Sequence, residues 1–178
     1  RDPDFDSKMH NVLVIYKQVS LQFDKDGNLL PFEGTPVHTL SYDEKPGIQA
    51  IGSTTPDLPP ISNTEKGSSY MRDYEYIRYG TISLLAAIDL LTGEAIPLVS
   101  DTHKSSDFVE FLTRLDAKYP EGDKIRLILD NHSAHTSQET QRYLNNHLGR
   151  FEFVFTPTHG FWLNLVEGFF SKLTKQML

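Results

Sequence analysis

The chain has 178 residues and a formal net charge of −7, with 38% hydrophobic and 23% charged residues and no cysteine. This length suits one domain with its own core, or one domain with an appended arm. No apolar stretch is long enough to cross a membrane and no signal sequence opens the chain, so we expect a cytoplasmic protein without membrane partners. The lack of cysteine excludes disulfides, thiolate nucleophiles and thiolate metal sites.

The acidic charge limits how the chain can bind nucleic acid. A net charge of −7 and a pI of about 5.4 argue against a large DNA footprint held by bulk electrostatics. An acidic cleft that collects divalent cations has the same composition. The sequence opens with RDPDFD and stops inside a helical pattern at SKLTKQML, so we expect a fragment that lacks basic DNA-binding parts.

The predicted elements begin with an amphipathic helix over residues 5–16. Its apolar residues recur at spacings of three and four: Phe5, Met9, Val12, Leu13 and Tyr16. Residues 24–36 are rich in turn formers and predict a loop, so residues 1–34 are expected to form an N-terminal helical arm and linker. The apolar face of this helix either packs on its own core or is buried by a second subunit.

Residues 35–178 predict strands first and then an alternation of strands and helices. Residues 37–42 predict a strand that ends at Asp43 and Glu44, and the proline-rich residues 46–69 predict a long loop. A β-hairpin is predicted from Gly80, with its turn at Gly93. The later predictions are a helix over 107–119 capped by Ser105 or Ser106, a strand over 124–129, a helix over 137–148, a strand over 151–155 and a closing helix from about Phe161.

This order implies an α/β protein with a mixed sheet flanked by helices on both faces, which is the layout of the ribonuclease H-like fold. Two of its strands, which are central neighbours in this layout, are predicted to end in carboxylates: the strand over 37–42 ends at Asp43, and the apolar run LIL ends at Asp130. Side chains at the carboxyl ends of strands are held firmly yet stay open to ligand. A turn-capping role is the alternative for an isolated aspartate.

A third carboxylate lies in the closing segment FWLNLVEGFFSKL. Helical spacing predicts one apolar stripe made of Phe161, Trp162, Leu165, Val166, Phe169 and Leu173. Glu167 sits among these residues, with Asn164 one turn earlier. A carboxylate in so apolar a setting costs desolvation energy unless a cation compensates it.

Three blocks of the chain resemble the signature of DDE transposases of the mariner-like bacterial insertion-sequence branch. The blocks are SYDEKPGIQAI, LILDNHSAH and HGFWLNLVEGFFSKL, and 36 residues separate Asp130 from Glu167. They match a strand ending in Asp, a strand ending in Asp-Asn, and an Asn-x-x-Glu helix. The resemblance extends over nearly the whole chain and includes DPDF, RDYEYIRYGT and AAIDLLTG.

The resemblance implies that Asp43, Asp130 and Glu167 are the catalytic and metal-binding acids. They would hold two Mg²⁺ ions, for which Mn²⁺ can substitute, cleave DNA at transposon ends and join the freed 3′-hydroxyl to target DNA. The implied partners are DNA and a second subunit of a homodimer, and the implied host is bacterial. Residues 35–178 are expected to be the catalytic domain, without the helix-turn-helix modules of such enzymes and with a truncated C-terminus.

Other residues are weaker candidates. His132 and His135 could join Asp130 in a zinc or iron site, but no third histidine lies at a suitable spacing. For Trp162 we favour core packing over stacking on a flipped base, and for Asp89 a structural role beside the hairpin turn. Candidates for DNA contact, each of which could equally be an ordinary solvated or structural residue, are Lys45, Arg72, Arg78, His132, Arg142, His159, Asn164 and Lys172.

Two other functional classes share parts of this pattern. Another nuclease of the same fold, such as a resolvase or an RNA–DNA hybrid nuclease, would use the same acids on a different substrate. A catalytically inactive, domesticated DNA-binding module would keep the fold, although the presence of all three acids weighs against it. Nucleotide hydrolysis and serine hydrolysis are unsupported, since neither a Walker-type loop nor a G-x-S-x-G elbow occurs.

Overall fold

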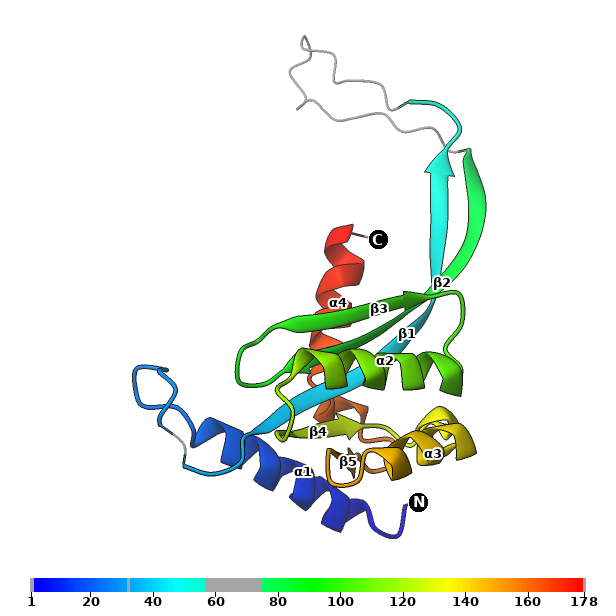
Figure 1. The fold of residues 1–178 in the computed structure, drawn as a ribbon. Coiled ribbons are helices and arrows are strands. Elements are labelled where there is room, and N and C mark those ends of the chain that lie inside the picture. The colour runs from blue at the N-terminus through cyan, green and yellow to red at the C-terminus, as the bar shows by residue number, and fades with distance from the viewer. Residues whose placement is uncertain (1, 32, 57–74, 178) are drawn as a thin grey trace, which may run out of the picture.

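A computed structural model describes residues 2–31, 33–56 and 75–177 of the chain. Five strands form one sheet in the order β3-β2-β1-β4-β5 (Figure 1). The strands are β1 (Val37–Ser53), β2 (Tyr76–Asp89), β3 (Ala95–Ser100), β4 (Lys124–Leu129) and β5 (Phe151–Phe155). β1 pairs antiparallel with β2 and parallel with β4, so the strands predicted to carry Asp43 and Asp130 are central neighbours.

Helices cover both faces of the sheet (Figure 1). One face packs against α2 (Ser105–Lys118) and α3 (Gln138–Asn146), and the other against α1 (Phe5–Ser20) and α4 (Val166–Met177). Successive residues of a strand point to opposite faces, so Leu127 and Leu129 join the α2 core while Ile128 packs with α1. The predicted mixed sheet with helices on both faces is confirmed.

β1 does not end at Asp43 as predicted, because its pairing with β2 continues to Ser53. A register shift between Lys45 and Ile48 accommodates Pro46 and Gly47. Proline cannot donate a ladder hydrogen bond and Gly47 has a φ of 70°, so both suit a bulge. The predicted loop over 46–69 is therefore wrong as far as Ser53, and its residues 57–69 lie outside the described ranges.

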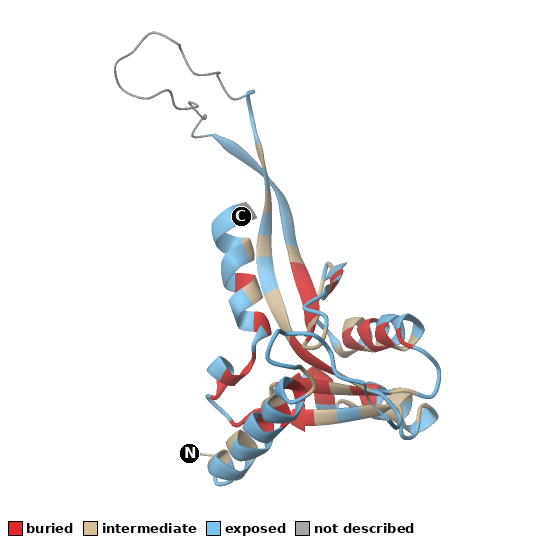
Figure 2. Cartoon of the chain, turned by 90° about the vertical axis from the view of Figure 1, so that its left-hand side faces the viewer, coloured by how far each residue is buried: buried red, intermediate tan, exposed pale blue. Residues whose placement is uncertain are grey.

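The distal parts of β1 and β2 form a two-stranded ribbon that projects beyond the sheet (Figure 1). Most of its residues are exposed, in contrast to the buried strands at the centre of the sheet (Figure 2). The hairpin formed by β2 and β3 is confirmed, although β2 begins at Tyr76 and not at Gly80. The ribbon thus extends the same two strands that carry Asp43 and the hairpin.

The closing segment differs from the single helix predicted from Phe161. Residues Phe161–Leu163 form a 3-10 turn (η2), and α4 begins only at Val166. The chain is extended at Asn164 between them, and this break shifts the face that each residue presents. Leu163, Val166 and Phe170 are buried, whereas the predicted stripe residues Phe161, Trp162 and Leu165 are exposed. The predicted core role of Trp162 is therefore wrong.

The N-terminal helix packs on its own chain. Val12 and Ile15 of α1 are buried against Ile128 and Val154 of the sheet, so the intramolecular alternative is the one observed. The hydroxyl of Tyr16 donates a hydrogen bond to the carbonyl of Leu163 in η2. Leu13, predicted on the apolar face, is 48% exposed.

The remaining elements agree closely with the predicted ones. β4 and β5 have the predicted bounds, and α3 begins after Ser137, whose hydroxyl accepts a hydrogen bond from the amide of Thr140. The N-cap of α2 is Lys104 and not Ser105 or Ser106; its amide donates to the carboxylate of Asp107 at 2.7 Å. Within the described ranges, no helix combines the length and the apolar character that crossing a membrane requires.

Candidate active site at the carboxyl end of the central strands

Asp43 and Asp130 lie level with each other on neighbouring parallel strands. The register of β1 and β4 pairs Ser41 with Ile128, and two residues further along come Asp43 and Asp130. Asp43 therefore points to the face covered by α1 and α4, since side chains alternate along a strand. Asp130 follows the last residue of β4, as predicted, and is half exposed.

Glu167 approaches this pair from the first turn of α4. Burial, together with the negative charges of Glu44, Asp130 and Glu167, raises the pKa of Asp43 to about 7, although the hydrogen bond from the amide of Glu44 opposes this rise. The charges of Asp130 and Glu167 therefore act on Asp43. Glu167 itself is exposed, so the predicted desolvation of this carboxylate is wrong.

Asp130 has the opposite electrostatic setting. Its pKa lies below the ordinary value because His135 and the amide of His132 donate hydrogen bonds to the carboxylate, which outweighs burial. The amide of His132 is 2.9 Å from Oδ1 of Asp130, and Nδ1 of His135 is 3.3 Å from the same oxygen. The neighbouring acids Asp43 and Asp130 thus have pKa values displaced in opposite directions, a pattern typical of functional sites.

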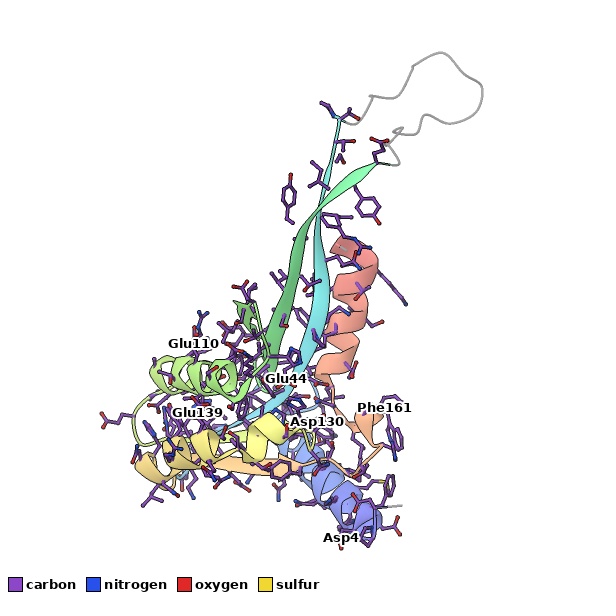
Figure 3. All side chains as sticks on the ribbon, turned by 90° about the vertical axis from the view of Figure 1, so that its right-hand side faces the viewer. Asp4, Glu44, Glu110, Asp130, Glu139 and Phe161 are labelled. Carbon is purple, nitrogen blue, oxygen red and sulfur yellow. The ribbon has the colours of Figure 1, made fainter. Side chains whose placement is uncertain are left out.

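A buried network supports Asp130 from beneath. His135 is fully buried; its Nε2 lies 2.9 Å from Oε1 of Glu44 and its Nδ1 lies 3.0 Å from the carbonyl oxygen of Asp130. The hydroxyl of Tyr42 donates to the same Oε1 at 2.8 Å. Burial alone would lower the pKa of His135, but its bonds to Asp130 and Glu44 raise it to about 9. Figure 3 shows Glu44 and Asp130 close together at the centre of the molecule.

The role of Glu44 in this network was not predicted from the sequence. The alternation of β1 contains a signal for it, because Tyr42 and Glu44 must point to the same face. The partner on the other side, His135, comes from the short 3-10 turn η1 (Ser133–Thr136), which no sequence pattern places beside β1. Only the folded chain brings these residues together.

Asn164, which was predicted as a candidate contact to DNA, is buried inside the site. It is 3% exposed, and its Nδ2 donates to the carbonyl of Tyr42 at 2.7 Å and to Oδ2 of Asp43 at 3.3 Å. The hydroxyl of Ser41 donates to Oδ1 of Asn164 and accepts the amide of Val166 at 3.1 Å. This arrangement ties the start of α4, and with it Glu167, to β1 beside Asp43.

Histidines and carboxylates also meet on the opposite side of the site. In the part of the chain that the structure describes, Glu44, His132 and His135 bring ligand atoms within 4.8 Å of one another, whereas the three predicted acids are not gathered so closely. Both ring nitrogens of His135 already have partners, which disfavours a zinc or iron site. Nδ1 of His132 is buried and has no hydrogen-bond partner in the protein.

The acids form a donor set that fits a hard divalent cation. Asp43, Asp130 and Glu167 offer only oxygen atoms, which are the ligands that Mg²⁺ and Mn²⁺ accept. A cation would also relieve the repulsion that raises the pKa of Asp43. The half-exposed carboxylate of Asp130 and the exposed Glu167 leave the site open to solvent and ligand.

The other predicted contact residues lie at different distances from this site. His159 follows β5 on an exposed loop and, with His132 and Phe161, lines a cavity of about 250 Å³ that Asp130 also lines. Lys45 follows the acids along β1 and is partly buried, and Lys172 is exposed on α4. Arg78 lies on the ribbon near the start of β2, and Arg142 is exposed on α3. Arg72 lies outside the described residues.

The mixed five-stranded sheet with helices on both faces is a ribonuclease H-like fold, and two aspartates at its central parallel strands with a glutamate on the last helix are the residue types of the DDE class of nucleases. Residues 53–178 match the profile of the DDE superfamily endonucleases, and the chain belongs to this family. The predicted resemblance to DDE transposases is thereby confirmed.

Known proteins support this assignment at the levels of sequence and fold. Over 90 residues the chain is 32% identical to an insertion element IS630 uncharacterized 39 kDa protein of Shigella sonnei. The aligned region covers 51% of this chain and 26% of that protein. A chain of the Mos1 mariner paired end complex with Mn aligns with 98% of this chain and 49% of its own length, at 13% identity and a TM-score of 0.57. A chain of the simian T-cell lymphotropic virus intasome aligns with 88% and 47%, at 15% identity and a TM-score of 0.51.

The last two similarities concern the fold alone. The chain spans about a quarter of the curated relative and about half of each structural relative.

Proposed function

We propose that the chain is the catalytic domain of a transposase of the mariner-like bacterial insertion-sequence branch. It cleaves DNA at transposon ends in a metal-dependent reaction and transfers the freed 3′-hydroxyl to target DNA. The observation that carries the proposal is the level placement of Asp43 and Asp130 on adjacent parallel strands, with Glu167 entering from α4. The sequence similarity to an insertion-element protein of Shigella sonnei favours this function over that of a resolvase or a hybrid nuclease.

In this proposal Asp43, Asp130 and Glu167 hold two Mg²⁺ ions, for which Mn²⁺ can substitute. When bound, such ions activate the attacking oxygen and stabilise the leaving oxygen of an in-line displacement at phosphorus. Asp43 must release its proton to act as a ligand, because its pKa of about 7 leaves it partly protonated at neutral pH. Asp130 is already ionised at this pH, since His135 and His132 stabilise its charge.

The protein groups around the acids set their positions before any ligand binds. Asn164 donates to Asp43 and anchors the chain three residues before Glu167, so one side chain relates two of the acids. His135 and Glu44 hold the backbone of Asp130 from the buried side. Such supporting hydrogen bonds orient metal ligands and limit the rearrangement that the reaction requires.

The proposed partners are DNA and a second copy of the chain, in the cytoplasm of a bacterial host. A chain with a net charge of −7 cannot hold DNA by bulk attraction, so we assign most of the affinity for DNA to segments outside this chain. Lys45, His159 and Lys172 remain proposed local contacts to phosphate.

Nicking of supercoiled plasmid in the presence of Mg²⁺ or Mn²⁺ tests the proposal. Asp130→Asn and Glu167→Gln should each lower the rate by at least about 100-fold, since even a supporting residue of a metal site is worth 10–100-fold. Glu110→Gln is the matched control, because Glu110 is an exposed carboxylate on α2 that pairs only with Arg114. Nicking that persists in both site variants would show that another site, or a contaminant, cleaves the DNA.

The substrate is tested separately from the chemistry. Cleavage of an insertion-sequence end duplex, a four-way junction and an RNA–DNA hybrid by the same preparation distinguishes the three nuclease classes. Preference for the end duplex supports the transposase. Preference for the junction or the hybrid assigns the same acids to the corresponding alternative nuclease, and binding of Mn²⁺ without cleavage of any substrate supports the inactive module.

A further inference from the structure

The loop between β5 and α4 exposes two neighbouring aromatic rings beside Asp130. Phe161 is 67% exposed and Trp162 is 56% exposed, and their ring centroids lie 5.5 Å apart in an edge-to-face arrangement. Large aromatic side chains usually dominate interior packing, so two exposed rings in sequence are unusual for a solvated loop. Figure 3 shows Phe161 at the outer side of this loop.

The loop that carries the rings is held in one conformation. The amide of Thr156 donates to the carbonyl of Leu129 at 2.9 Å, and Nδ2 of Asn131 donates to the carbonyl of Thr156 at 2.7 Å. His159 has a φ of 66°, an uncommon conformation for a residue with a side chain. A Cβ at Gly160 would lie 2.7 Å from the ring of Pro157, so only glycine fits there.

The residues that anchor the same loop to the core lie just after the rings. Leu163 and Asn164 are buried, and the amide of Leu163 donates to the carbonyl of Gly160 at 2.9 Å. The exposure of Phe161 and Trp162 therefore does not follow from a loose loop end. The anchored residues on either side present the rings to solvent in fixed positions.

The cavity beside Phe161 connects this ring to the candidate active site, and Trp162 lies edge-to-face behind it. The cavity has a volume of about 250 Å³ and is lined by Asp130, His132, His159 and Phe161 among others. Asp130 and Phe161 lie in the wall of one cavity, so a group bound at Asp130 has the ring of Phe161 as a neighbour. The two histidines in the cavity wall can donate hydrogen bonds to phosphate, and an aromatic face accepts any base without sequence preference.

We propose that Phe161 and Trp162 form a stacking platform for an unpaired nucleobase next to the phosphate that is cleaved. The inference rests on the proposed function, because it takes DNA as the ligand of Asp130. The base is unpaired because only a base outside the duplex stack exposes the face that a ring must contact. The platform holds one nucleotide at the cleaved end and leaves sequence recognition to other contacts.

Trp162 is the only tryptophan of the chain, so its fluorescence reports on the platform directly. The full chain is titrated in EDTA with a 12-nucleotide single-stranded DNA and with an abasic strand of the same length. The base-containing strand should quench the emission, and the abasic strand should bind at least about fivefold more weakly, which is on the order of one lost base–aromatic stack. Equal quenching and affinity with both strands overturns the proposal.

Substitutions at Phe161 separate stacking from simple apolar contact. Phe161→Leu should weaken binding of the base-containing strand by at least about fivefold, and Phe161→Tyr should restore it, because tyrosine keeps the aromatic face. Tyr79→Ala is the matched control, since Tyr79 is 72% exposed on the ribbon, far from the cavity. A loss in Tyr79→Ala as large as that in Phe161→Leu would show that binding is not confined to the platform and overturns the proposal.

A second copy of the chain is the competing occupant of these rings. Emission of Trp162 that shifts with protein concentration in the absence of DNA, together with a dimer in sedimentation that Phe161→Leu abolishes, assigns the surface to self-association and overturns the proposal. The titration is repeated with Mn²⁺ and an uncleaved strand, and strand binding is read without cleavage. Its failure is therefore distinguishable from failure of the proposed function, which plasmid nicking measures. Plasmid nicking that requires Asp130 while strand binding ignores Phe161 removes the platform alone.

Discussion

Asp43 and Asp89 lie on the neighbouring strands β1 and β2, three residue pairs apart and on opposite faces of the same sheet. Asp89 is 2% exposed, and its carboxylate accepts hydrogen bonds from the amides of Leu91 and Thr92 and from the hydroxyl of Tyr119, at 2.8, 3.2 and 2.7 Å. Among the described residues, Asp43 accepts hydrogen bonds from the amide of Glu44 and the side chain of Asn164, and the charges of three further carboxylates raise its pKa.

This difference separates a structural acid from a candidate ligand-binding one. At Asp89 the two turn amides and the Tyr119 hydroxyl have their hydrogen-bond acceptor within the chain, so the hairpin turn needs no ligand. Around Asp43 the charges of Glu44, Asp130 and Glu167 raise its pKa, while His135 pairs with Glu44 and Asp130. Among the described residues, Nδ1 of His132 is buried without a hydrogen-bond partner. A site that is electrostatically incomplete in the protein alone is completed by what it binds.

The largest effect on stability is expected from substitution of Asp89. Asp89→Ala leaves two turn amides and the Tyr119 hydroxyl without their acceptor, and each orphaned buried donor costs roughly 1–3 kcal/mol, so we expect about 3 kcal/mol less stability. Urea unfolding measures this loss. Asp43→Ala serves as the comparison and should cost far less, because it also removes repulsion; an equal loss in both variants would erase the distinction.

Metal binding should give the next largest effect on stability, and this effect should depend on the acids around Asp43. Mn²⁺ at about 100 times its dissociation constant should stabilise the native state by roughly 2.7 kcal/mol, because the ion binds the folded chain only. Thermal unfolding with and without Mn²⁺ gives this gain. Asp130→Asn should lose most of it and Tyr119→Phe, which removes only the hydrogen bond to Asp89, should keep it.

The affinity for Mn²⁺ should rise with pH through the titration of Asp43. A carboxyl group with a pKa of about 7 must release its proton before it binds the ion. Between pH 6 and pH 8 this release should strengthen binding about tenfold, as measured by calorimetry. In Asp43→Asn the dependence over this range should disappear along with much of the affinity, and a wild-type affinity that stays constant would contradict the raised pKa.

The smallest effect concerns the stability of the metal-free chain. The pKa of Asp43 is raised from 3.8 to about 7 in the folded state, so the native state binds this proton more tightly than the unfolded state does. The stability from this group is fully present below about pH 4 and is lost as pH rises through 7.

Asp43→Asn should therefore flatten the decline in stability over this range and gain about 1 kcal/mol at pH 8, after allowance for the partial exposure of the carboxyl. Urea unfolding at several pH values in EDTA measures it. Glu110→Gln, on an exposed carboxylate, should reproduce the wild-type profile. Asp130→Asn should act in the opposite direction, because a lowered pKa contributes stability that is lost as pH falls.

Much of the architecture follows from local sequence patterns. The apolar run before Asp130 predicts β4 with correct bounds, because a short run of branched residues between turn formers has few alternatives to a buried strand. The same reasoning predicts β5, the hairpin and the order of helices. The resemblance of three blocks to a known family adds the identity of the acids, which local patterns alone leave open.

The places where prediction and structure differ are those where distant contacts override local preference. Pro46 signals the end of a strand, yet β2 continues to pair with β1 beyond it because a bulge absorbs the proline. Helical spacing joins Phe161 to α4, yet the hydrogen bonds of Asn164 to β1 interrupt the helix there. In both cases a partner more than twenty residues away supplies the deciding hydrogen bonds.

The sequence by itself determined the strand and helix order and placed carboxylates at the ends of apolar elements. These properties depend on periodicity, turn chemistry and the alternation of side chains along a strand, all of which are local. Only the tertiary structure decided that Asn164 is buried against Asp43, that His135 and Glu44 support Asp130, and that Trp162 faces solvent. The reason is physical: burial, pKa and hydrogen-bond partners depend on which surfaces meet, and those surfaces come from parts of the chain that are far apart in sequence.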